Sequence, residues 1–322
     1  MTEPDRFLAD LARVASGTPR PLLLAVSGGP DSMAMLVLAA DALPGGIAVA
    51  TVDHGLRAEA ADEAAMVAAA CASLHVPHAT LTGTTPPGAS LQAQARALRY
   101  ALLADHARDI GAEAIATAHH ADDQAETFLM RAARGVGLSG LAGIRAVTTI
   151  EGARVVRPLL DWRRAELRAI VRRAELPFVD DPANGDDRHD RTRFRRLIDG
   201  NEWLDPPRLA RSAAALAEAD AELNAVAGWL WDARASSPEH GVVALDVAGL
   251  PRGLLRILAR RAITAVRDEA GMVAPHWSDG VNVEPLLDAL AQGRRATQAG
   301  VVAGMRRGRW RFRQAPARRS VA

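Results

Sequence analysis

Residues 21–40 read PLLLAVSGGPDSMAMLVLAA, and this stretch decides the fold. A run of apolar residues ends at Val26, two glycines follow, and a helical pattern begins at Asp31. Glycines at a strand-to-helix turn let backbone N–H groups approach a phosphate, and the helix dipole adds partial positive charge there. Serine hydroxyls on both sides add further donors. We therefore expect a phosphate-binding loop made of Ser27, Gly28, Gly29, Pro30, Asp31 and Ser32.

Asp31 is the unusual residue of this loop. A carboxylate repels a bound phosphate unless a divalent cation lies between them, so Asp31 predicts a Mg²⁺ contact. The alternative is a tight turn in which Asp31 caps the helix that follows. The complete pattern, at the end of a predicted strand, favours the phosphate and Mg²⁺ site.

Short apolar runs alternate with helical patterns through the first half of the chain. Strands are expected at 21–27, 47–53, 77–82 and 112–118, and helices from residue 31, over 59–74, over about 90–108 and over about 122–134. This alternation is typical of parallel βαβ units. We expect an α/β fold with a doubly wound, mostly parallel sheet. Such sheets bind ligands beyond the carboxyl ends of their strands, here near Ser27, Asp53, Thr82 and Ala118.

The second half of the chain predicts a connecting helix and a smaller α+β domain. Glycine-rich residues 134–143 and acidic residues 180–190 are expected to be loops. Further on we expect a helix over 206–235, a strand at 242–247, a helix over 252–267 and a hairpin over 301–314. The predicted domains are a nucleotide-binding domain (1–200), a helical linker (201–235) and a C-terminal domain (236–322).

The basic residues exclude one class of nucleotide-binding protein and indicate a partner. All 39 are arginine, so the Gly-Lys-Ser/Thr ending of a P-loop NTPase is absent. Residues 1–150 hold 10 Arg and 15 acidic residues, whereas residues 151–322 hold 29 Arg and 23 acidic residues. Seven arginines and no acid occur from 306 to 319. This basic second half fits an RNA partner.

Cysteine and apolar content place the chain among cytoplasmic proteins. Cys71 is the single cysteine, so no internal disulfide forms, and the nine histidines show no zinc spacing around it. The longest apolar runs are far below membrane-spanning length, so we expect no membrane segment. The sequence leaves the oligomeric state open, a homodimer included.

Acidic and imidazole side chains follow the second and fourth predicted strands. Asp53 could bind a ribose, with a turn role as its alternative, and His54 and Arg57 follow it. After the fourth strand, Asp123 and Glu126 share one face of a helix that starts near Ala121. Two carboxylates facing a triphosphate imply Mg²⁺, although acids also favour helix N-termini without any metal. The histidines before this helix, His119 and His120, could instead be buried and hydrogen-bonded at its start.

Two arginine groups complete the set of candidates. Gln92, Arg96 and Arg99 lie along one side of the third predicted helix, where a solvated face is the alternative. Five arginines occur between 188 and 196, with Phe194 among them, and predict a phosphate-contacting patch.

Six motifs in order resemble the tRNA(Ile)-lysidine synthetase family of the N-type ATP pyrophosphatases, which have an adenine-nucleotide alpha-hydrolase-like, Rossmann-like fold. The motifs are SGGPDS, VDHGLR, LQAQARALRY, TAHHADDQAET, RGVGLSGLAGI and RPLLDWRRAEL, and they cover about residues 20–200. The remaining residues are similar only in layout, as a form with one tRNA-binding C-terminal domain. The family usually has Arg-Asn-Arg where this chain has Arg191-Thr192-Arg193.

The resemblance implies a ligase that forms a C–N bond. The family attaches free L-lysine to C2 of the first anticodon cytidine of CAU-anticodon tRNA(Ile), through an adenylated intermediate that consumes ATP. Expected catalytic groups are Asp31, Arg96, Asp123 and Glu126, with Mg²⁺ held by Asp31 and Asp123. Expected ATP contacts are the loop 27–32 with Asp53, His54 and Arg57. Expected substrate or tRNA contacts are Arg99, His119, His120, Arg191, Arg193 and Arg195.

Three other functions share parts of this pattern. tRNA thiolases need cysteines to carry sulfur or bind a cluster, and one cysteine argues against them. Amide-forming synthetases such as GMP or NAD synthetase do not need an arginine-rich appended domain. A non-catalytic RNA-binding module would not need Asp31, Asp123 and Glu126. The choice of catalytic base among Glu126, His119 and His120 stays open.

Overall fold

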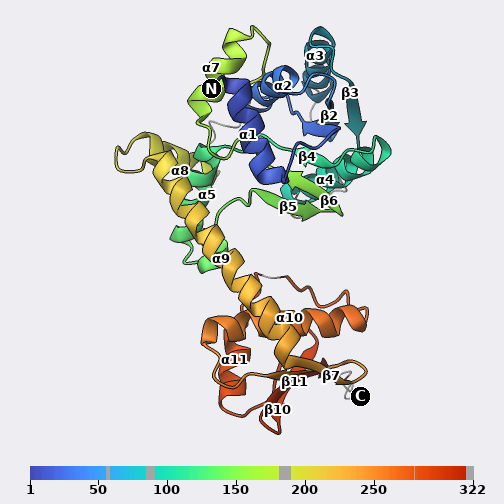
Figure 1. Cartoon of the computed structure of the whole chain (residues 1–322), viewed down its shortest axis with the longest axis vertical. Coiled ribbons are helices and arrows are strands. Elements are labelled where there is room, and N and C mark those ends of the chain that lie inside the picture. Colours follow the sequence, from blue (N-terminus) through green and yellow to red (C-terminus); the bar gives the residue numbers. More distant parts are fainter. Residues whose placement is uncertain (56–58, 85–90, 181–189, 279, 317–322) are drawn as a thin grey trace. The chain divides into compact units, whose positions relative to one another are not determined.

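The computed structural model describes residues 1–55, 59–84, 91–180, 190–278 and 280–316, and the predicted ATP contact Arg57 lies outside them. The chain divides into two compact units, Met1–Ala217 and Glu218–Ala322 (Figure 1). The boundary falls inside one long helix, α9 (Pro206–Arg234), which matches the helix expected there. The three-part domain division remains a prediction. In the described part of the chain, no helix is long and apolar enough to cross a membrane.

A six-stranded sheet forms the centre of the first unit. Its strand order is β3-β2-β1-β4-β6-β5, and every neighbouring pair is parallel except β5 with β6. Because the order runs outward from β1 in both directions, the sheet is doubly wound, and ligands of such sheets bind where the order reverses. The strands are β1 (Leu22–Ala25), β2 (Ile47–Asp53), β3 (His78–Thr82), β4 (Ala114–Ala116), β5 (Val147–Ile150) and β6 (Ala153–Val156).

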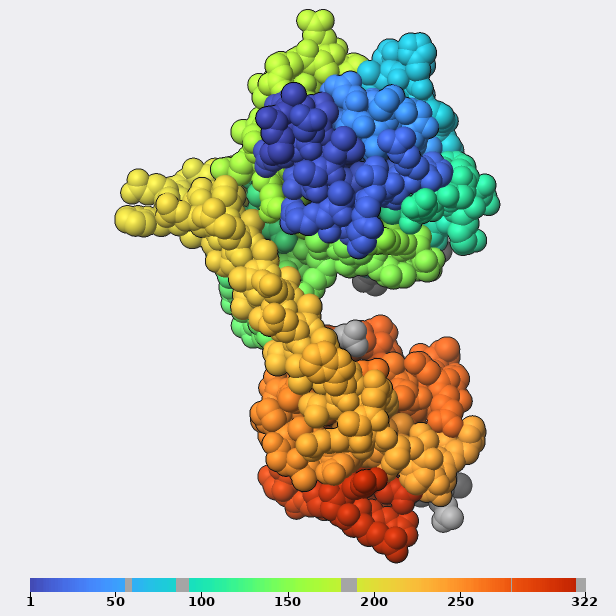
Figure 2. Space-filling view, in the orientation of Figure 1, coloured from blue at the N-terminus to red at the C-terminus, as the bar shows by residue number. Residues whose placement is uncertain are grey.

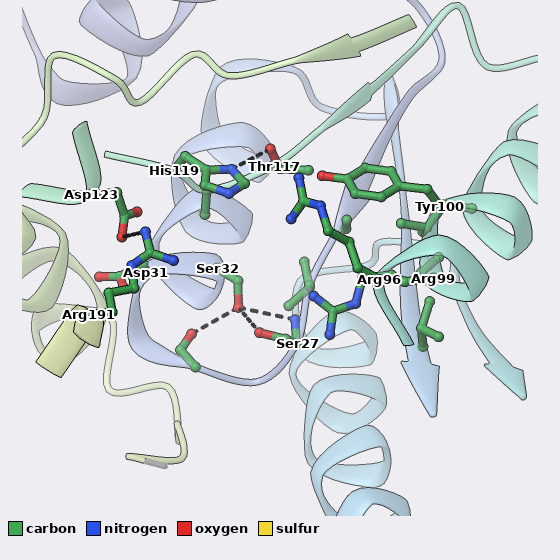
Figure 3. A pocket seen from close by; sticks show the side chains of 17 residues that line it. Ser27, Asp31, Ser32, Arg96, Arg99, Tyr100, Thr117, His119, Asp123 and Arg191 are labelled. Atoms are coloured by element: carbon green, nitrogen blue, oxygen red, sulfur yellow. Dashed lines mark hydrogen bonds and ion pairs between the residues drawn. The ribbon is translucent and has the colours of Figure 1, made fainter. Parts of the chain in front are cut away.

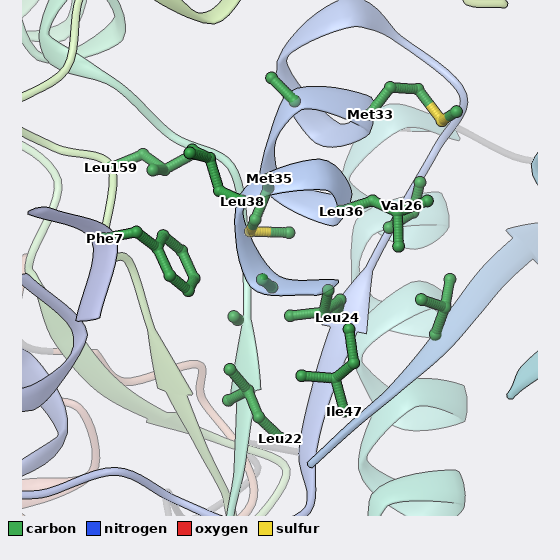
Figure 4. Packing of buried hydrophobic residues seen from close by; sticks show 14 of the residues in the cluster. Phe7, Leu22, Leu24, Val26, Met33, Met35, Leu36, Leu38, Ile47 and Leu159 are labelled. Carbon is green, nitrogen blue, oxygen red and sulfur yellow. The ribbon is translucent and has the colours of Figure 1, made fainter. Parts of the chain in front are cut away.

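Helices cover both faces of this sheet. Successive side chains of a strand point to opposite faces, and apolar side chains on each face are buried beneath helices. Leu22 and Leu24 pack into a core with Phe7, Met35 and other apolar side chains (Figure 4), whereas Leu23 packs with the opposite layer. Four helices contribute buried side chains to the first core: α1 (Glu3–Ala15), α2 (Pro30–Ala42), α3 (Glu59–Ser73) and α7 (Arg164–Arg173). Helix α4 (Leu91–Asp109) contributes to the core on the opposite face. This two-sided burial explains why the strands are continuous apolar runs.

Three more helices of this unit follow the fourth strand in sequence, and two of them pack against the first. They are α5 (Ala121–Ala133), α6 (Leu138–Leu141) and α8 (Asp190–Asp199). The expectation of a loop over 134–143 is wrong in part, because α6 forms one helical turn within it. The acidic loop expected over 180–190 lies mostly outside the described residues.

The second unit is an antiparallel sheet covered by two helices. Its strand order is β7-β8-β11-β10-β9, and the hairpin expected over 301–314 is formed by β10 and β11. The strands are β7 (Ala235–Glu239), β8 (Val242–Asp246), β9 (Ala296–Gln298), β10 (Val301–Arg306) and β11 (Arg309–Gln314), and the helices are α10 (Arg252–Glu269) and α11 (Glu284–Ala291). Trp310 and Phe312 fill the core of this unit. The predicted combination of a parallel α/β domain with a smaller α+β domain is confirmed.

Candidate active site

The phosphate loop joins β1 to α2 in a conformation that requires glycine. Gly28 has φ +86°, and a Cβ atom there would lie 3.2 Å from Cε of Met66. Gly29 is the N-cap of α2 and provides no side-chain cap, so Asp31 lies inside the first helical turn and is not the cap. Ser32 Oγ donates to the carbonyl of Gly29 over 2.9 Å and accepts the N–H of Ser27 over 3.2 Å. The serines therefore stabilise the shape of the loop.

A cavity of about 270 Å³ opens beside this loop, where the strand order reverses between β1 and β4. Figure 3 shows Asp31, Asp123 and Arg191 on one side of it and arginines of α4 on the opposite side. Its polar lining residues are Ser27, Asp31, Ser32, Arg96, Arg99, Tyr100, Thr117, His119, Asp123 and Arg191. A second cavity of about 570 Å³ shares the loop and Arg99 and adds His54, Glu63, Arg164, Arg168 and Arg195.

His120 brings the two expected metal-binding carboxylates to one atom. Its Nε2 lies 3.3 Å from Oδ2 of Asp31 and 3.6 Å from Oδ2 of Asp123. The imidazole is 1% exposed and caps α5, because Nδ1 accepts the N–H of Asp123 over 3.3 Å. Burial opposes the charged imidazolium, but the Asp123 charge and the Asp31 hydrogen bond outweigh burial and raise the pKa of His120. His120 is thus buried at the helix start, as its alternative interpretation expected.

Glu126 is the centre of a buried cluster of ion pairs. Its carboxylate is 1% exposed and accepts from Arg164 Nη2 over 2.6 Å, from Arg195 Nε over 2.8 Å and from Arg191 Nε over 2.9 Å. Arg191 also donates to Oδ1 of Asp123 over 2.9 Å. These bonds join α5 to both α7 and α8. Arg191 and Arg195, which were expected in an open phosphate-contacting patch, therefore form ion pairs with carboxylates of the site.

His119 lies in the cavity wall with a very different environment. Thr117 Oγ1 lies 2.9 Å from its Nδ1. Burial lowers the pKa of His119 to about 4, with Asp123 opposing the change and Arg157, Arg191 and Arg96 adding to it. The imidazole is therefore neutral at pH 7.

Arginines on α4 form the opposite wall. The guanidinium of Arg96 lies 5.0 Å from the ring centre of Tyr100, a cation–π contact. Nε of Arg99 lies 3.4 Å from Nε2 of His54, which brings the end of β2 to the same wall. Asp53 has a turn role, since its Oδ1 accepts the N–H of Gly55 over 2.8 Å.

Comparison with known proteins identifies the family that this arrangement belongs to. A family model described as a PP-loop domain matches residues 5–200. The tRNA(Ile)-lysidine synthase of Novosphingobium aromaticivorans is 47% identical over 300 residues, which are 92% of this chain and 90% of that protein. The chain belongs to the tRNA(Ile)-lysidine synthase family. The member from Zymomonas mobilis is 41% identical over 307 residues, 92% of this chain and 89% of that protein. The resemblance expected from the six motifs is confirmed.

Solved structures extend the likeness in fold beyond the tRNA(Ile)-lysidine synthase family. A U34-tRNA thiolase from Methanococcus maripaludis, solved with its 4Fe–4S cluster, has a TM-score of 0.54 at 15% identity. The likeness covers 68% of this chain and 78% of that chain. At this identity it shows the fold alone.

Helix α8 shows where the residues of the Arg191-Thr192-Arg193 stretch lie. Thr192, the middle residue, is 6% exposed and points away from the solvent. Arg191 before it contacts Asp123 and Glu126, while Arg193 after it is exposed. The Thr192 side chain is therefore buried, between one arginine that binds carboxylates of the site and one that faces the solvent.

Sequence reasoning missed the contribution of α7. Asp122 accepts the backbone N–H of Arg164 over 2.8 Å and the side chain of Arg163 over 3.2 Å, which fixes the start of α7 beside α5. Arg164 then reaches Glu126. The signal was present in RPLLDWRRAEL, which the tRNA(Ile)-lysidine synthase resemblance already included, but nothing local to it indicates which carboxylates the paired arginines bind.

The residues beside the phosphate loop fit a Mg²⁺ ion that is shared with a bound nucleotide. Oδ1 of Asp31 is buried and lacks a hydrogen-bond partner within the described residues. No group of three or more acidic, histidine or cysteine side chains in the described chain could hold a metal alone. Mg²⁺ is commonly bound by one or two carboxylates together with substrate phosphates. Asp31 and Asp123 match that mode, and not a site built from protein ligands only.

Proposed function

We propose that this chain uses ATP to join free L-lysine to C2 of the first anticodon cytidine of tRNA(Ile) with a CAU anticodon. In the first step O2 of the cytidine attacks the α-phosphate of ATP, and pyrophosphate leaves. In the second step the ε-amine of lysine attacks C2, and AMP leaves with O2. The observation that carries this proposal is the meeting of Asp31 and Asp123 at His120, beside a glycine loop and a cavity.

The loop binds the phosphates that leave as pyrophosphate. Gly28 and Gly29 bring backbone N–H groups to the N-terminus of α2, where the helix dipole favours anions. Arg96 and Arg99 face this loop from α4 and add two positive charges to the cavity wall. Developing negative charge on the phosphates is stabilised by groups that are already in position.

Asp31 and Asp123 would hold Mg²⁺ against the phosphates. The ion would neutralise charge on the leaving pyrophosphate. Asp123 stays ionised for this role, because the charges of His120 and Arg191 outweigh burial and lower its pKa. Asp31 offers the freer carboxylate, since one of its oxygens lacks a partner in the described chain.

Lysine must lose a proton before its amine attacks, since its unperturbed pKa is about 10.4. Glu126 is poorly placed to accept that proton, because three guanidinium groups bind its two oxygens. We assign Glu126 as a positioning residue that holds Arg164, Arg191 and Arg195. His119 is neutral and lines the cavity, where it can accept a hydrogen bond from the lysine ammonium, but its pKa of about 4 makes it too weak a base to take up the proton. Nε2 is the accepting nitrogen when Nδ1–H donates to Thr117.

The second unit would bind the phosphate backbone of tRNA. Arg306 of β10 and Arg311 and Arg313 of β11 line a cavity of about 310 Å³ together with Arg295. Arg311 is paired there with Glu239. One guanidinium group can donate two parallel hydrogen bonds to the oxygens of one phosphate. The affinity for tRNA that results falls as the salt concentration rises. A cytoplasmic location belongs to this proposal, since ATP, free lysine and tRNA occur together there. A homodimer remains a prediction.

A thiolase activity is the weaker alternative. Thiolases need reactive cysteines or a cluster, and the chain holds only Cys71. Cys71 is fully buried, and burial raises the pKa of its thiol to about 11. A protonated and inaccessible thiol does not carry sulfur to a substrate.

One experiment tests the proposed reaction directly. The protein is incubated with ATP, Mg²⁺, radiolabelled lysine and a CAU-anticodon tRNA(Ile) transcript, and label in the tRNA is counted. We expect label to enter this transcript but not one whose first anticodon base is uridine. If ATP binds and no label enters the tRNA, the lysidine proposal is wrong.

A matched pair of variants tests the role of Asp31. Asp31→Asn should abolish AMP release and leave tRNA affinity nearly unchanged. Asp41→Asn is the control, because Asp41 is an exposed residue at the other end of the same helix. Loss of tRNA binding in Asp31→Asn would contradict its assigned role at the phosphates.

A further inference from the structure

Helix α8 has two chemically different faces. Its inner face carries Arg191 and Arg195 to the buried carboxylates of α5. Four residues on the opposite side recur at spacing i, i+3, i+4 and i+7, which places them in one row along a helix. This outer face of α8 lines a shallow cavity of about 350 Å³ and consists of Asp190, Arg193, Phe194 and Leu197. The reaction so far proposed uses only the inner face.

Apolar side chains at the end of α8 are unusually exposed. Leu197 is 50% exposed, and Trp203, in the turn that follows α8, is 81% exposed. That turn is ordered by hydrogen bonds, since Asn201 accepts the backbone N–H groups of Trp203 and Leu204 over 3.0 Å. Figure 2 shows this yellow segment standing out from the surface of the first unit. An indole held in water contributes little to folding, so its exposure suggests a bound partner.

Charge on the same segment indicates the chemistry of that partner. Arg193 is exposed and forms no ion pair or hydrogen bond with any residue that the structure describes. The one acid of the outer face, Asp190, is already paired with Arg134 over 2.8 Å. Uncommitted guanidinium groups bind phosphates, and exposed aromatic rings stack on nucleobases. Together these groups fit single-stranded RNA.

We propose that the outer face of α8, continued by Trp203, stacks the anticodon-loop bases next to the cytidine that enters the active site. The inference rests on the proposed function. Chemistry on one base requires that base to leave its stack, and its neighbours then lose a stacking partner. An aromatic side chain replaces that partner. The two faces of α8 are separated by one helix diameter of about 10–12 Å, so a neighbouring nucleotide is within reach.

Three substitutions at Trp203 separate stacking from simple apolar contact. Affinity of the full chain for the CAU-anticodon tRNA(Ile) transcript is measured by fluorescence anisotropy. We expect Trp203→Ala and Trp203→Leu each to weaken binding about tenfold, and Trp203→Phe to stay within about threefold of the parent. ATP affinity should not change. Val147→Ala is the control, because Val147 is an exposed apolar residue of the first unit, on the edge strand β5, and lines neither cavity of the site.

Tryptophan emission gives a readout that a structural role would not alter. Stacking of a base on Trp203 should quench part of the emission when tRNA is added, and Trp203→Phe should lose that part while keeping affinity. An abasic nucleotide beside the modified cytidine should weaken binding to the parent protein about as much as Trp203→Ala does. Combining both changes should add little further loss, as expected for two partners in one contact.

Several results would overturn the inference. Full affinity in Trp203→Ala, rescue by Trp203→Leu, or an equal loss in Val147→Ala would each do so. Sedimentation tests whether a second copy of the chain, instead of tRNA, covers this surface. A parent dimer that becomes a monomer in Trp203→Ala would show that the outer face of α8 and Trp203 form an interface between two copies. The inference and the proposed function fail separately, because a parent protein that labels its tRNA while Trp203→Ala binds normally sinks only the inference.

Discussion

Nη2 of Arg191 donates to Oδ1 of Asp123 over 2.9 Å, and this bond joins α8 to the first turn of α5. Nε of the same guanidinium binds Glu126, so one arginine holds two acidic residues three positions apart on one helix. Arg191 therefore links Asp123, which is expected to bind metal, to Glu126, which anchors α8. A substitution at either acid should change the position of the other.

Removing the charge of Glu126 should destabilise the first unit strongly. Glu126→Gln leaves the guanidinium groups of Arg164, Arg191 and Arg195 without their shared buried carboxylate. Breaking a buried ion pair costs about 3–5 kcal/mol. We expect a loss of unfolding free energy in that range, measured by urea denaturation.

An exposed ion pair provides the control for this change. Asp190→Asn breaks the ion pair between Asp190 and Arg134, and both of these side chains are more than half exposed. The unfolding free energy should fall by less than about 1 kcal/mol. Equal losses in the two variants would show that burial does not set the strength of the Glu126 cluster.

Gly28→Ala should reduce ATP affinity at least tenfold. A Cβ atom at φ +86° is strained and also approaches Met66, so the loop must change shape to relieve both problems. Gly45→Ala is the control, because Gly45 has φ +69° but no atom within 4 Å of a Cβ and lies outside the two cavities of the site. We expect both variants to lose similar stability in thermal unfolding, and only Gly28→Ala to lose ATP binding in calorimetry. Unchanged ATP affinity in Gly28→Ala would contradict the phosphate role of the loop.

The sheet could be predicted from sequence because its signals are local. Leu22, Leu23 and Leu24 form a continuous apolar run because β1 is covered on both faces. The glycine loop after it marks the turn into α2. Helix α1 also has a local signal, since Thr2 and Asp5 form a capping box before Phe7 and Leu11, although no helix was predicted there.

The ion-pair cluster could not be predicted in the same way. Glu126 meets Arg164 and Arg191, which lie 38 and 65 positions further along the chain. No periodicity connects such residues, and an arginine-rich helix looks alike whether it faces RNA or a buried acid. The family motifs include both arginines, but only Arg191 was predicted at the site, and the partners of both became visible only in three dimensions.

Cys71 should react very slowly with iodoacetamide in the folded protein. Its side chain is fully buried, and burial raises the pKa of the thiol to about 11 from its usual value of about 9. Because only the thiolate reacts, the folded protein should be alkylated at least about 100-fold more slowly than the urea-unfolded protein at pH 8. The rate should rise with pH below 11. Rapid alkylation at pH 7 without unfolding would show that the thiol is accessible.

His119 should give the protein a dependence of stability on pH below neutrality. Its pKa is about 4 in the folded protein and about 6.5 in an unfolded chain, so only the unfolded chain takes up a proton between these values. The contribution of His119 is therefore complete above pH 6.5 and is lost as the pH falls towards 4. At pH 5 the loss should be about 2 kcal/mol.

His119→Asn removes this group and tests the sign. Between pH 7 and pH 5 the parent protein should lose more unfolding free energy in urea than the variant does. NMR of the parent imidazole provides the direct measurement, and its carbon shifts should titrate near pH 4. A His119 that titrates near pH 6.5 would mean that the cavity wall is open to water. It would then be partly charged at neutral pH, contrary to the neutral imidazole proposed for the cavity wall.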